Sequence, residues 1–155
     1  MRNVFCRPAR IGLLVFAQLL FLAGCSGDEQ VVFADGSHTQ MSHWDDRYLV
    51  INYWAEWCAP CRHEIPEFNA LHEARVANGI VMLGVNYDNL QGEKLTDVIE
   101  RMDIQFPVLA EDPQERYGYE RAQTLPMTVI INPAREVHDV LIGPQTQASV
   151  TAALN

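Results

Sequence analysis

Continuous apolar runs alternate with stretches of helical period along the chain. Residues 48–54 and 80–87 are rich in aliphatic, β-branched and aromatic side chains, which predicts strands covered on both faces of a sheet. Between these runs, apolar residues recur at steps of three and four, the period of a helix with one apolar face. The pattern therefore predicts strand, helix and strand, with the helix over 60–77 and Gly79 at its end.

Turn residues and shorter apolar runs divide the rest of the chain into further elements. Strands are expected at 31–34, 127–131 and 136–142, helices at 93–102, 113–117 and 145–154, and an apolar segment at 106–109. Parallel strands that alternate with helices and end in a hairpin predict an α/β sandwich. The stretch 31–155 is long enough to bury a core, so we expect it to form one domain.

Two cysteines lie where the first long strand meets the first long helix. The segment Cys58-Ala59-Pro60-Cys61 places Cys58 on the first turn of the helix. Unpaired backbone N–H groups and the positive end of the helix dipole favour a thiolate there. A thiolate is the attacking species in thiol–disulfide exchange, and a nearby second thiol displaces the bound partner. We predict that Cys58 is the nucleophile, because it is nearer the exposed start of the helix, and that Cys61, one turn further on, is the more buried resolving thiol.

Other uses of a C-x-x-C pair explain this sequence less well. A structural disulfide would close a loop too short to remove much chain entropy. A zinc site needs about four ligands, and the sequence has no second C-x-x-C and no paired histidines. Covalent haem attachment needs a histidine directly after the second cysteine, where this chain has Arg62 and only then His63. The pair is therefore interpreted as redox-active, and we expect neither a metal nor a cofactor.

The N-terminus has the composition of an export signal. Three arginines precede an apolar run at 11–23, which is too short to span a bilayer comfortably. The run closes with L-A-G-C, which resembles a bacterial lipobox and ends at Cys25. We expect a lipoprotein signal peptide at 1–24, lipidation of Cys25 and a polar tether over 25–30, with an uncleaved anchor or an ordinary signal peptide as the alternative. Ser26 favours the outer membrane, by analogy with enteric lipoproteins.

Export changes both the cysteine count and the charge. Cys6 would leave with the signal and Cys25 would carry lipid, so only the C-x-x-C pair would remain free. An exported protein with one such pair does not use disulfides as scaffolding. Eight basic and 20 acidic residues would remain, which changes the net charge from −9 to −12. Such a surface repels nucleic acid and anionic headgroups, so we expect a soluble domain on a lipid tether that does not lie on the bilayer. We also expect a monomer.

The sequence around the cysteines resembles that of a known family. Residues 53–61, Y-W-A-E-W-C-A-P-C, are similar to the active-site segment of thioredoxin-fold proteins. The continuation R-H-E-I-P-E-F at 62–68 is similar to the TlpA/ResA/CcmG family of extracytoplasmic thiol–disulfide reductases, and L-P-M-T at 125–128 resembles the cis-proline loop of that family. The resemblance covers about residues 31–155. It implies a thioredoxin-like three-layer α/β/α sandwich with a mixed central sheet and the TlpA-type insertion at 88–117.

The resemblance also implies which residues meet the substrate. In this family, the loop that here contains Leu125 and Pro126 lies against the C-x-x-C, and its backbone pairs with an extended substrate segment. Trp57 is expected to shield the thiols and to offer an apolar landing area, whereas Trp54 is expected in the core. Met127 departs from the threonine common at its position, which leaves the substrate preference open.

Proton transfer needs a group other than the one that thioredoxins use. Asn52 stands where thioredoxins carry a buried proton-shuttling Asp, and a neutral amide cannot take a proton from Cys61. Glu64, one helical turn past Cys61, matches an acidic position of the ResA-like proteins and would have a raised pKa if partly buried. The alternative is an ordinary exposed helix glutamate. His63 and Glu56 are expected to be solvated surface residues.

Together these features predict a lipid-anchored periplasmic reductase of protein disulfides. No histidine lies between Cys58 and Cys61, so weaker thiolate stabilisation is expected than in the strong oxidants of this fold, which favours a reductant. A membrane thiol carrier of the DsbD/CcdA type would supply its electrons. The alternatives are a disulfide oxidase or isomerase of the same fold and a metallochaperone that holds copper(I) on the two thiolates. A thiol peroxidase fits less well, because its site is a lone peroxidatic cysteine.

Overall fold

The computed structural model describes residues 29–154, without the side chains of 75–78. The expected signal peptide at 1–24 and the lipidation site Cys25 therefore lie outside the described residues. Within the described part of the chain, no helix combines the length and the apolar character that crossing a bilayer requires.

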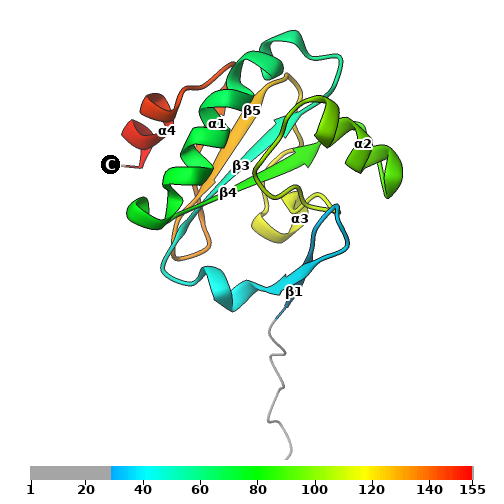
Figure 1. Ribbon diagram of the computed structural model, residues 1–155. Helices are drawn as coiled ribbons and strands as arrows, with labels where there is room; N and C mark the ends of the chain where they lie inside the picture. The colour runs from blue at the N-terminus through cyan, green and yellow to red at the C-terminus, as the bar shows by residue number, and fades with distance from the viewer. Residues whose placement is uncertain (1–28, 155) are drawn as a thin grey trace, which may run out of the picture.

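A four-stranded mixed sheet forms the centre of the domain (Figure 1). Its strands, in the order β4-β3-β5-β6, are β3 (Tyr48–Trp54), β4 (Ile80–Asn86), β5 (Met127–Ile131) and β6 (Val137–Ile142). β3 pairs with β4 in parallel and with β5 in antiparallel orientation, and β5 and β6 form the expected hairpin. β3 is thus a central strand, and its carboxyl end leads into the C-x-x-C segment.

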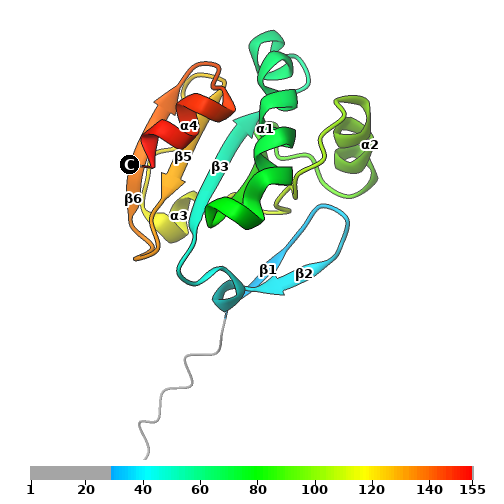
Figure 2. The same ribbon diagram turned by 60° about the vertical axis from the view of Figure 1, so that its left-hand side comes forward.

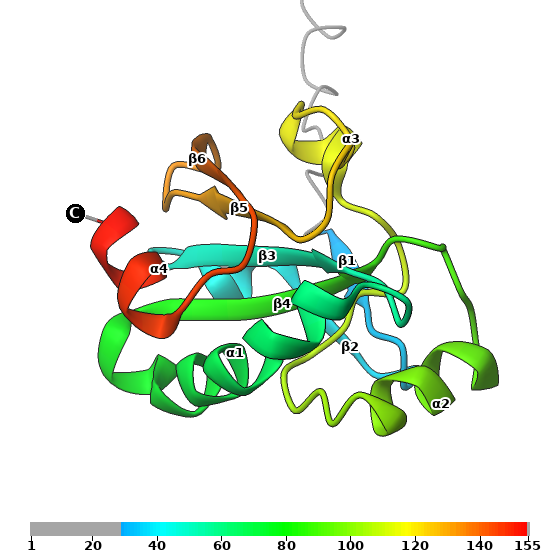
Figure 3. The same cartoon turned by 90° about the horizontal axis from the view of Figure 1, so that it is seen from above.

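Three helices pack on one face of the sheet (Figures 2 and 3). They are α1 (Ala59–Asn78), α2 (Glu93–Arg101) and α4 (Gln147–Ala153). Val50 and Trp54 of β3 point to this face, where they share one apolar cluster with Phe68 of α1, Leu95 of α2 and Val150 of α4. Burial of each large apolar side chain contributes roughly 1.5–3 kcal/mol, so this cluster fixes α1 and the cysteines at its start against β3.

The opposite face of the sheet is covered mostly by irregular chain. Leu49, Ile51 and Tyr53 of β3 point to this side. The elements that contribute side chains to it are β1 (Gln30–Val32), the 3₁₀ helix η1 (Met41–Trp44) and the one-turn helix α3 (Gln114–Tyr117), while β2 (His38–Gln40) pairs with β1 as a hairpin. Figure 3 shows α3 and α1 on opposite sides of the sheet. The predicted thioredoxin-like α/β/α sandwich with a mixed sheet is therefore confirmed, with one thin outer layer.

The insertion at 88–117 connects the sheet to the N-terminal hairpin. Its segment 107–109 exchanges two backbone hydrogen bonds of 2.8 Å with Gly84 of β4 and accepts a third, also of 2.8 Å, from Ala34 next to β1. The outer edge of β4 is therefore paired at this point instead of presenting free N–H and C=O groups.

Most predicted helices and strands have ends within two residues of those in the structure. β2 and η1 were not predicted, because their sequences H-T-Q and M-S-H-W carry neither a strand alternation nor a helical period. β1 begins at Gln30, inside the expected tether over 25–30, and Glu29 forms an ion pair with Arg116 at 2.6 Å. The folded domain therefore begins earlier than the expected boundary at residue 31.

Candidate active site

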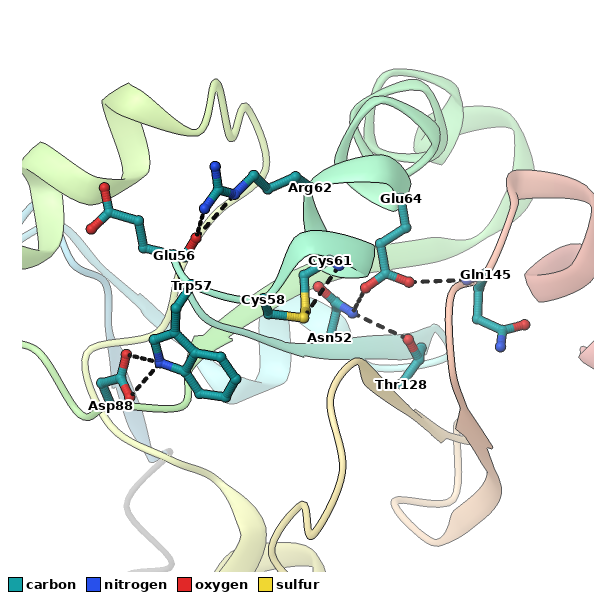
Figure 4. The surroundings of a disulfide bond; sticks show 10 residues. All are labelled: Asn52, Glu56, Trp57, Cys58, Cys61, Arg62, Glu64, Asp88, Thr128 and Gln145. Carbon is teal, nitrogen blue, oxygen red and sulfur yellow. Dashed lines mark hydrogen bonds between the residues drawn. A yellow bond between two sulfur atoms is a disulfide. The ribbon is translucent and has the colours of Figure 1, made fainter.

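The loop after β3 brings the two cysteines to the start of α1 (Figure 4). Cys58 is the N-cap residue of α1, and its Sγ accepts the backbone N–H of Cys61 at 3.3 Å. The two cysteines form a disulfide with their Cα atoms 5.3 Å apart. Pro60 lies in the first turn, where its missing N–H removes no helical hydrogen bond. The predicted position of the pair on the first turn of the helix is confirmed.

Both cysteine side chains are buried in this oxidised form. Cys58 is 4% exposed and Cys61 is 0% exposed. Cys61 is thus the more buried of the two, as expected, and Cys58, although it lies at the start of the helix, is also buried in the disulfide form. Both residues belong to the apolar cluster beneath α1, and Leu125 packs against that cluster. Any molecule that reaches the Cys58 sulfur must therefore come into close contact with the surrounding residues.

Glu64 is a buried carboxyl group one turn along α1 from Cys61. Its side chain is 1% exposed, so the alternative of an exposed helix glutamate is wrong. Its Oε1 accepts a hydrogen bond from Asn52 Nδ2 at 2.8 Å, and its Oε2 accepts one from the backbone N–H of Gln145 at 2.9 Å (Figure 4). Burial raises the pKa of Glu64 from 4.5 to about 7, although the hydrogen bonds from Gln145 and Asn52 act in the opposite direction.

Asn52 joins Glu64 to the strand that follows the cis-proline loop. The Asn52 side chain lies in the middle of β3 and is fully buried. Its Nδ2 also donates to Oγ1 of the buried Thr128 on β5, at 3.3 Å. From the sequence, Asn52 was interpreted only as a missing acid, and Thr128 only as the last residue of the cis-proline motif. The sequence does carry one signal for these contacts: Asn52 is a polar residue inside an otherwise apolar strand, and such a residue needs a buried hydrogen-bond partner.

Trp57 projects from the loop before Cys58 and is 62% exposed. Its indole Nε1 donates to both carboxylate oxygens of Asp88, at 3.2 and 3.1 Å, and its ring meets that of Tyr87 edge to face. The guanidinium of Arg121 stacks over Tyr87 at 4.8 Å from the ring centre. An exposed indole in the loop before Cys58 is thus held in one orientation by its neighbours.

The cis-proline loop lies at the same end of the sheet as the cysteines. The peptide bond between Leu125 and Pro126 is cis, as the resemblance implied. The loop leads directly into β5, whose first residue Met127 pairs with Tyr53 near the end of β3. Leu125 also packs against the apolar cluster that contains both cysteines, so the loop and the C-x-x-C adjoin the same cluster.

The remaining candidate residues lie outside this arrangement. His63 is exposed and Trp54 is fully buried in the core, both as expected. Glu56 is not simply solvated, because its carboxylate pairs with both Nε and Nη2 of Arg101, at 2.8 and 3.1 Å. Over residues 29–154 we find no group of three or more His, Cys, Asp or Glu side chains placed to bind a metal.

Comparisons with known proteins give the family of the chain. A family model described as AhpC/TSA family matches residues 28–140. Sporulation thiol-disulfide oxidoreductase A of Bacillus subtilis is 25% identical over 99 residues, which cover 63% of this chain and 60% of that protein. The thiol-disulfide oxidoreductase ResA of Oceanobacillus iheyensis is 28% identical over 122 residues, which cover 78% of this chain and 62% of that protein. The chain thus spans about three-fifths of the length of these two relatives.

The fold agrees with these sequence matches. The crystal structure of StoA from Bacillus subtilis superimposes with a TM-score of 0.63 at 20% identity, covering 83% of this chain and 98% of that one. The range matched by the family model contains the C-x-x-C pair, Glu64 and the cis-proline loop. The chain therefore belongs to the AhpC/TSA family and has the thioredoxin fold.

Proposed function

We propose that this protein is a thiol–disulfide oxidoreductase that acts on disulfides of other proteins. The observation that carries the proposal is the position of Cys58, whose Sγ accepts a backbone N–H at the start of α1 and is bonded to Cys61. The same N–H stabilises a thiolate at Cys58 after reduction. The names of the Bacillus subtilis and Oceanobacillus iheyensis relatives describe thiol-disulfide oxidoreductases, which supports the proposal.

The reaction transfers two electrons from the dithiol to the substrate. The Cys58 thiolate attacks one sulfur of a substrate disulfide, which forms a mixed disulfide and releases the other substrate sulfur as a thiolate that takes up a proton. Cys61 then loses its proton and attacks Sγ of Cys58. This second exchange forms the Cys58–Cys61 disulfide and releases the second substrate thiol.

Glu64 is proposed to exchange protons with the thiol pair. Residues three apart on a helix lie on the same face, so the Glu64 carboxyl group is a neighbour of Cys61. A group with a pKa of about 7 accepts and returns a proton readily near neutral pH. Both carboxylate oxygens already accept hydrogen bonds, so the group is held in place for this role.

Leu125, Pro126 and Trp57 are proposed to contact the substrate. The cis-proline loop and the cysteines share one end of the sheet, and an extended peptide that binds there would pair with the loop backbone. The exposed indole of Trp57 would cover an apolar part of the same segment.

The proposed direction is reduction of substrates outside the cytoplasm. The residues between the cysteines, Ala59 and Pro60, add no cation that would stabilise the thiolate further, as a strong oxidant requires. A reductant in an oxidising compartment needs an electron donor, and we propose a membrane thiol carrier of the DsbD/CcdA type. The signal-like segment 1–24 and Cys25 support a lipid anchor in the cell envelope.

The test is to trap the mixed disulfide. In a Cys61→Ser variant, the second exchange is blocked, so substrates should remain bound to Cys58 and should be released by dithiothreitol. Cys58→Ser is the matched control and should trap nothing. The wild type should also reduce insulin disulfides in the presence of dithiothreitol, and its reduction potential should lie below about −200 mV.

Two results would contradict this function. One is insulin reduction that survives loss of Cys58. The other is stoichiometric copper(I) on the purified reduced protein together with no disulfide reduction, which would favour the metallochaperone. A potential near about −120 mV would keep the chemistry but reverse its direction.

A further inference from the structure

The amide of Asn52 uses both of its N–H groups inside the protein. Nδ2 donates to Glu64 Oε1 at 2.8 Å and to Thr128 Oγ1 at 3.3 Å (Figure 4). The three residues come from β3, α1 and β5, and all three are buried. The Glu64 carboxylate sets which end of the amide faces it, because an amide turned over would present its carbonyl oxygen to the carboxylate, and the Thr128 hydroxyl accepts the second N–H and holds the amide in place.

The carbonyl end of the same amide is left without a partner. Asn52 Oδ1 is buried, and none of the described residues donates a hydrogen bond to it. A buried unpaired acceptor lowers stability, and an apolar residue at this position in an apolar strand would avoid that loss. A purely structural role does not account for an amide here. Its two N–H groups, one directed at Glu64 and the other at Thr128, do.

Few other groups act on the Glu64 carboxyl. Gln145, on the segment between β6 and α4, contributes a backbone N–H, and Thr128 on β5 is an uncharged hydroxyl. On α1 itself, the titratable neighbours are Cys61, which is in the disulfide, and Glu67, which accepts the backbone N–H of Gln147 at 3.0 Å. The side-chain donor that Glu64 depends on is therefore Asn52.

We propose that Asn52 is the positioning residue of this site: held by Thr128, its amide orients the carboxylate of Glu64 and sets the proton affinity of that carboxylate. The inference rests on the proposed function, in which Glu64 exchanges protons with the cysteines. Asn52 thus replaces the proton-shuttling acid of thioredoxins by acting through a second residue instead of by titrating itself.

The direct test follows the Glu64 carboxyl by carbon-13 NMR in the oxidised protein, where the cysteines do not titrate. Removing the amide in Asn52→Leu should raise the titration midpoint of Glu64 by about one pH unit, a tenfold gain in proton affinity, because the carboxylate loses a charge-assisted hydrogen bond. Thr128→Val should shift the midpoint in the same direction by less. Thr128→Ser keeps the hydroxyl and should leave the midpoint where it is.

The Thr128 pair decides the inference if Asn52→Leu does not fold. A midpoint that stays at the wild-type value in Thr128→Val, or that moves equally in Thr128→Ser, would overturn it. The proposed function is tested separately, by the pH dependence of Cys58 alkylation in the reduced protein. A Glu64→Gln variant with the wild-type alkylation profile would show that Glu64 takes no part in the thiol chemistry. The NMR titration midpoints would still decide whether Asn52 positions the carboxylate.

Discussion

Glu64 shows how one buried carboxyl group makes the stability of this protein depend on pH. Its pKa is raised to about 7 because burial penalises the charged form, while the unfolded chain returns the group to its ordinary value of 4.5. Between these two values, the folded protein keeps a proton that the unfolded chain releases. Stability from this residue is therefore highest below pH 4.5 and falls as the pH rises through 7.

The fall in stability with rising pH gives a quantitative prediction for Glu64→Gln. The variant lacks the titrating group. The pH dependence of the difference in unfolding free energy between wild type and variant therefore reports the titration of Glu64. From pH 4 to pH 8, the wild type should lose about 3 kcal/mol relative to the variant. Urea unfolding of both oxidised proteins at each pH measures the difference. Stability curves that stay parallel would show that Glu64 titrates normally.

The sequence predicted the positions of some site residues but not the burial and contacts of others. The cysteine pair and its place on the helix follow from neighbouring residues, because a strand, a C-x-x-C and a helical period are adjacent in the chain. The burial of Glu64 did not follow, because its partners Asn52 and Gln145 come from other elements. Thr128 was missed for the same reason, since nothing near it in the sequence indicates a contact with β3.

At the level of elements, α1 and the cis-proline loop both accept backbone hydrogen bonds from the segment between β6 and the first residue of α4. The carboxylates of Glu64 and Glu67 accept the backbone N–H groups of Gln145 and Gln147, at 2.9 and 3.0 Å. In the same segment, the N–H of Gly143 donates to the carbonyl of Pro126 at 2.9 Å. The start of α4 therefore contributes to holding both halves of the candidate site.

The N-cap of α4 stabilises the start of this helix, next to the segment that contacts α1. Thr146 Oγ1 accepts the N–H of Ser149 at 3.1 Å, and Ser149 Oγ accepts the N–H of Thr146 at 2.9 Å, which is a reciprocal capping box. Thr146→Ala should lower the unfolding free energy by about 1 kcal/mol. Thr146→Ser keeps the acceptor and should cost much less. Equal losses in the two variants, measured by urea unfolding, would exclude the cap as the cause.

Elements with a strong pattern were predicted well, and elements held only by tertiary contacts were not. The apolar runs of β3, β4 and β5 and the helical period of α1 identify them without further information. β2 has three polar residues and pairs only with β1, so its position depends on the hairpin. The start of α4 was placed too early, because Gln145 is held by Glu64 instead of by the helix.

At the scale of the whole molecule, the insertion is packed onto the central sheet at Gly84. An added Cβ there would lie 2.9 Å from both Phe106 Cε2 and Trp54 Nε1, and 3.1 Å from Val108 Cγ2. Only a glycine therefore lets the insertion approach β4 closely enough to form the two hydrogen bonds of the bridge.

Gly84→Ala tests whether this contact holds the insertion in place. The extra methyl group should force Phe106 and Val108 outward and lower the unfolding free energy by about 1–3 kcal/mol. Gly84→Ala combined with Phe106→Leu should recover part of the loss. Urea unfolding measures both variants, and a single variant as stable as wild type would show that the insertion adapts without strain.

The most direct measurement of the central claim is the rate at which each cysteine of the reduced protein is alkylated as the pH changes. If the N-terminus of α1 stabilises a thiolate at Cys58, this residue should react faster than Cys61, with a half-maximal rate at least about one unit below the ordinary thiol value of 8.5. An alkylation midpoint for Cys58 at about 8.5, with reactivity no greater than that of an ordinary exposed thiol, would contradict the account.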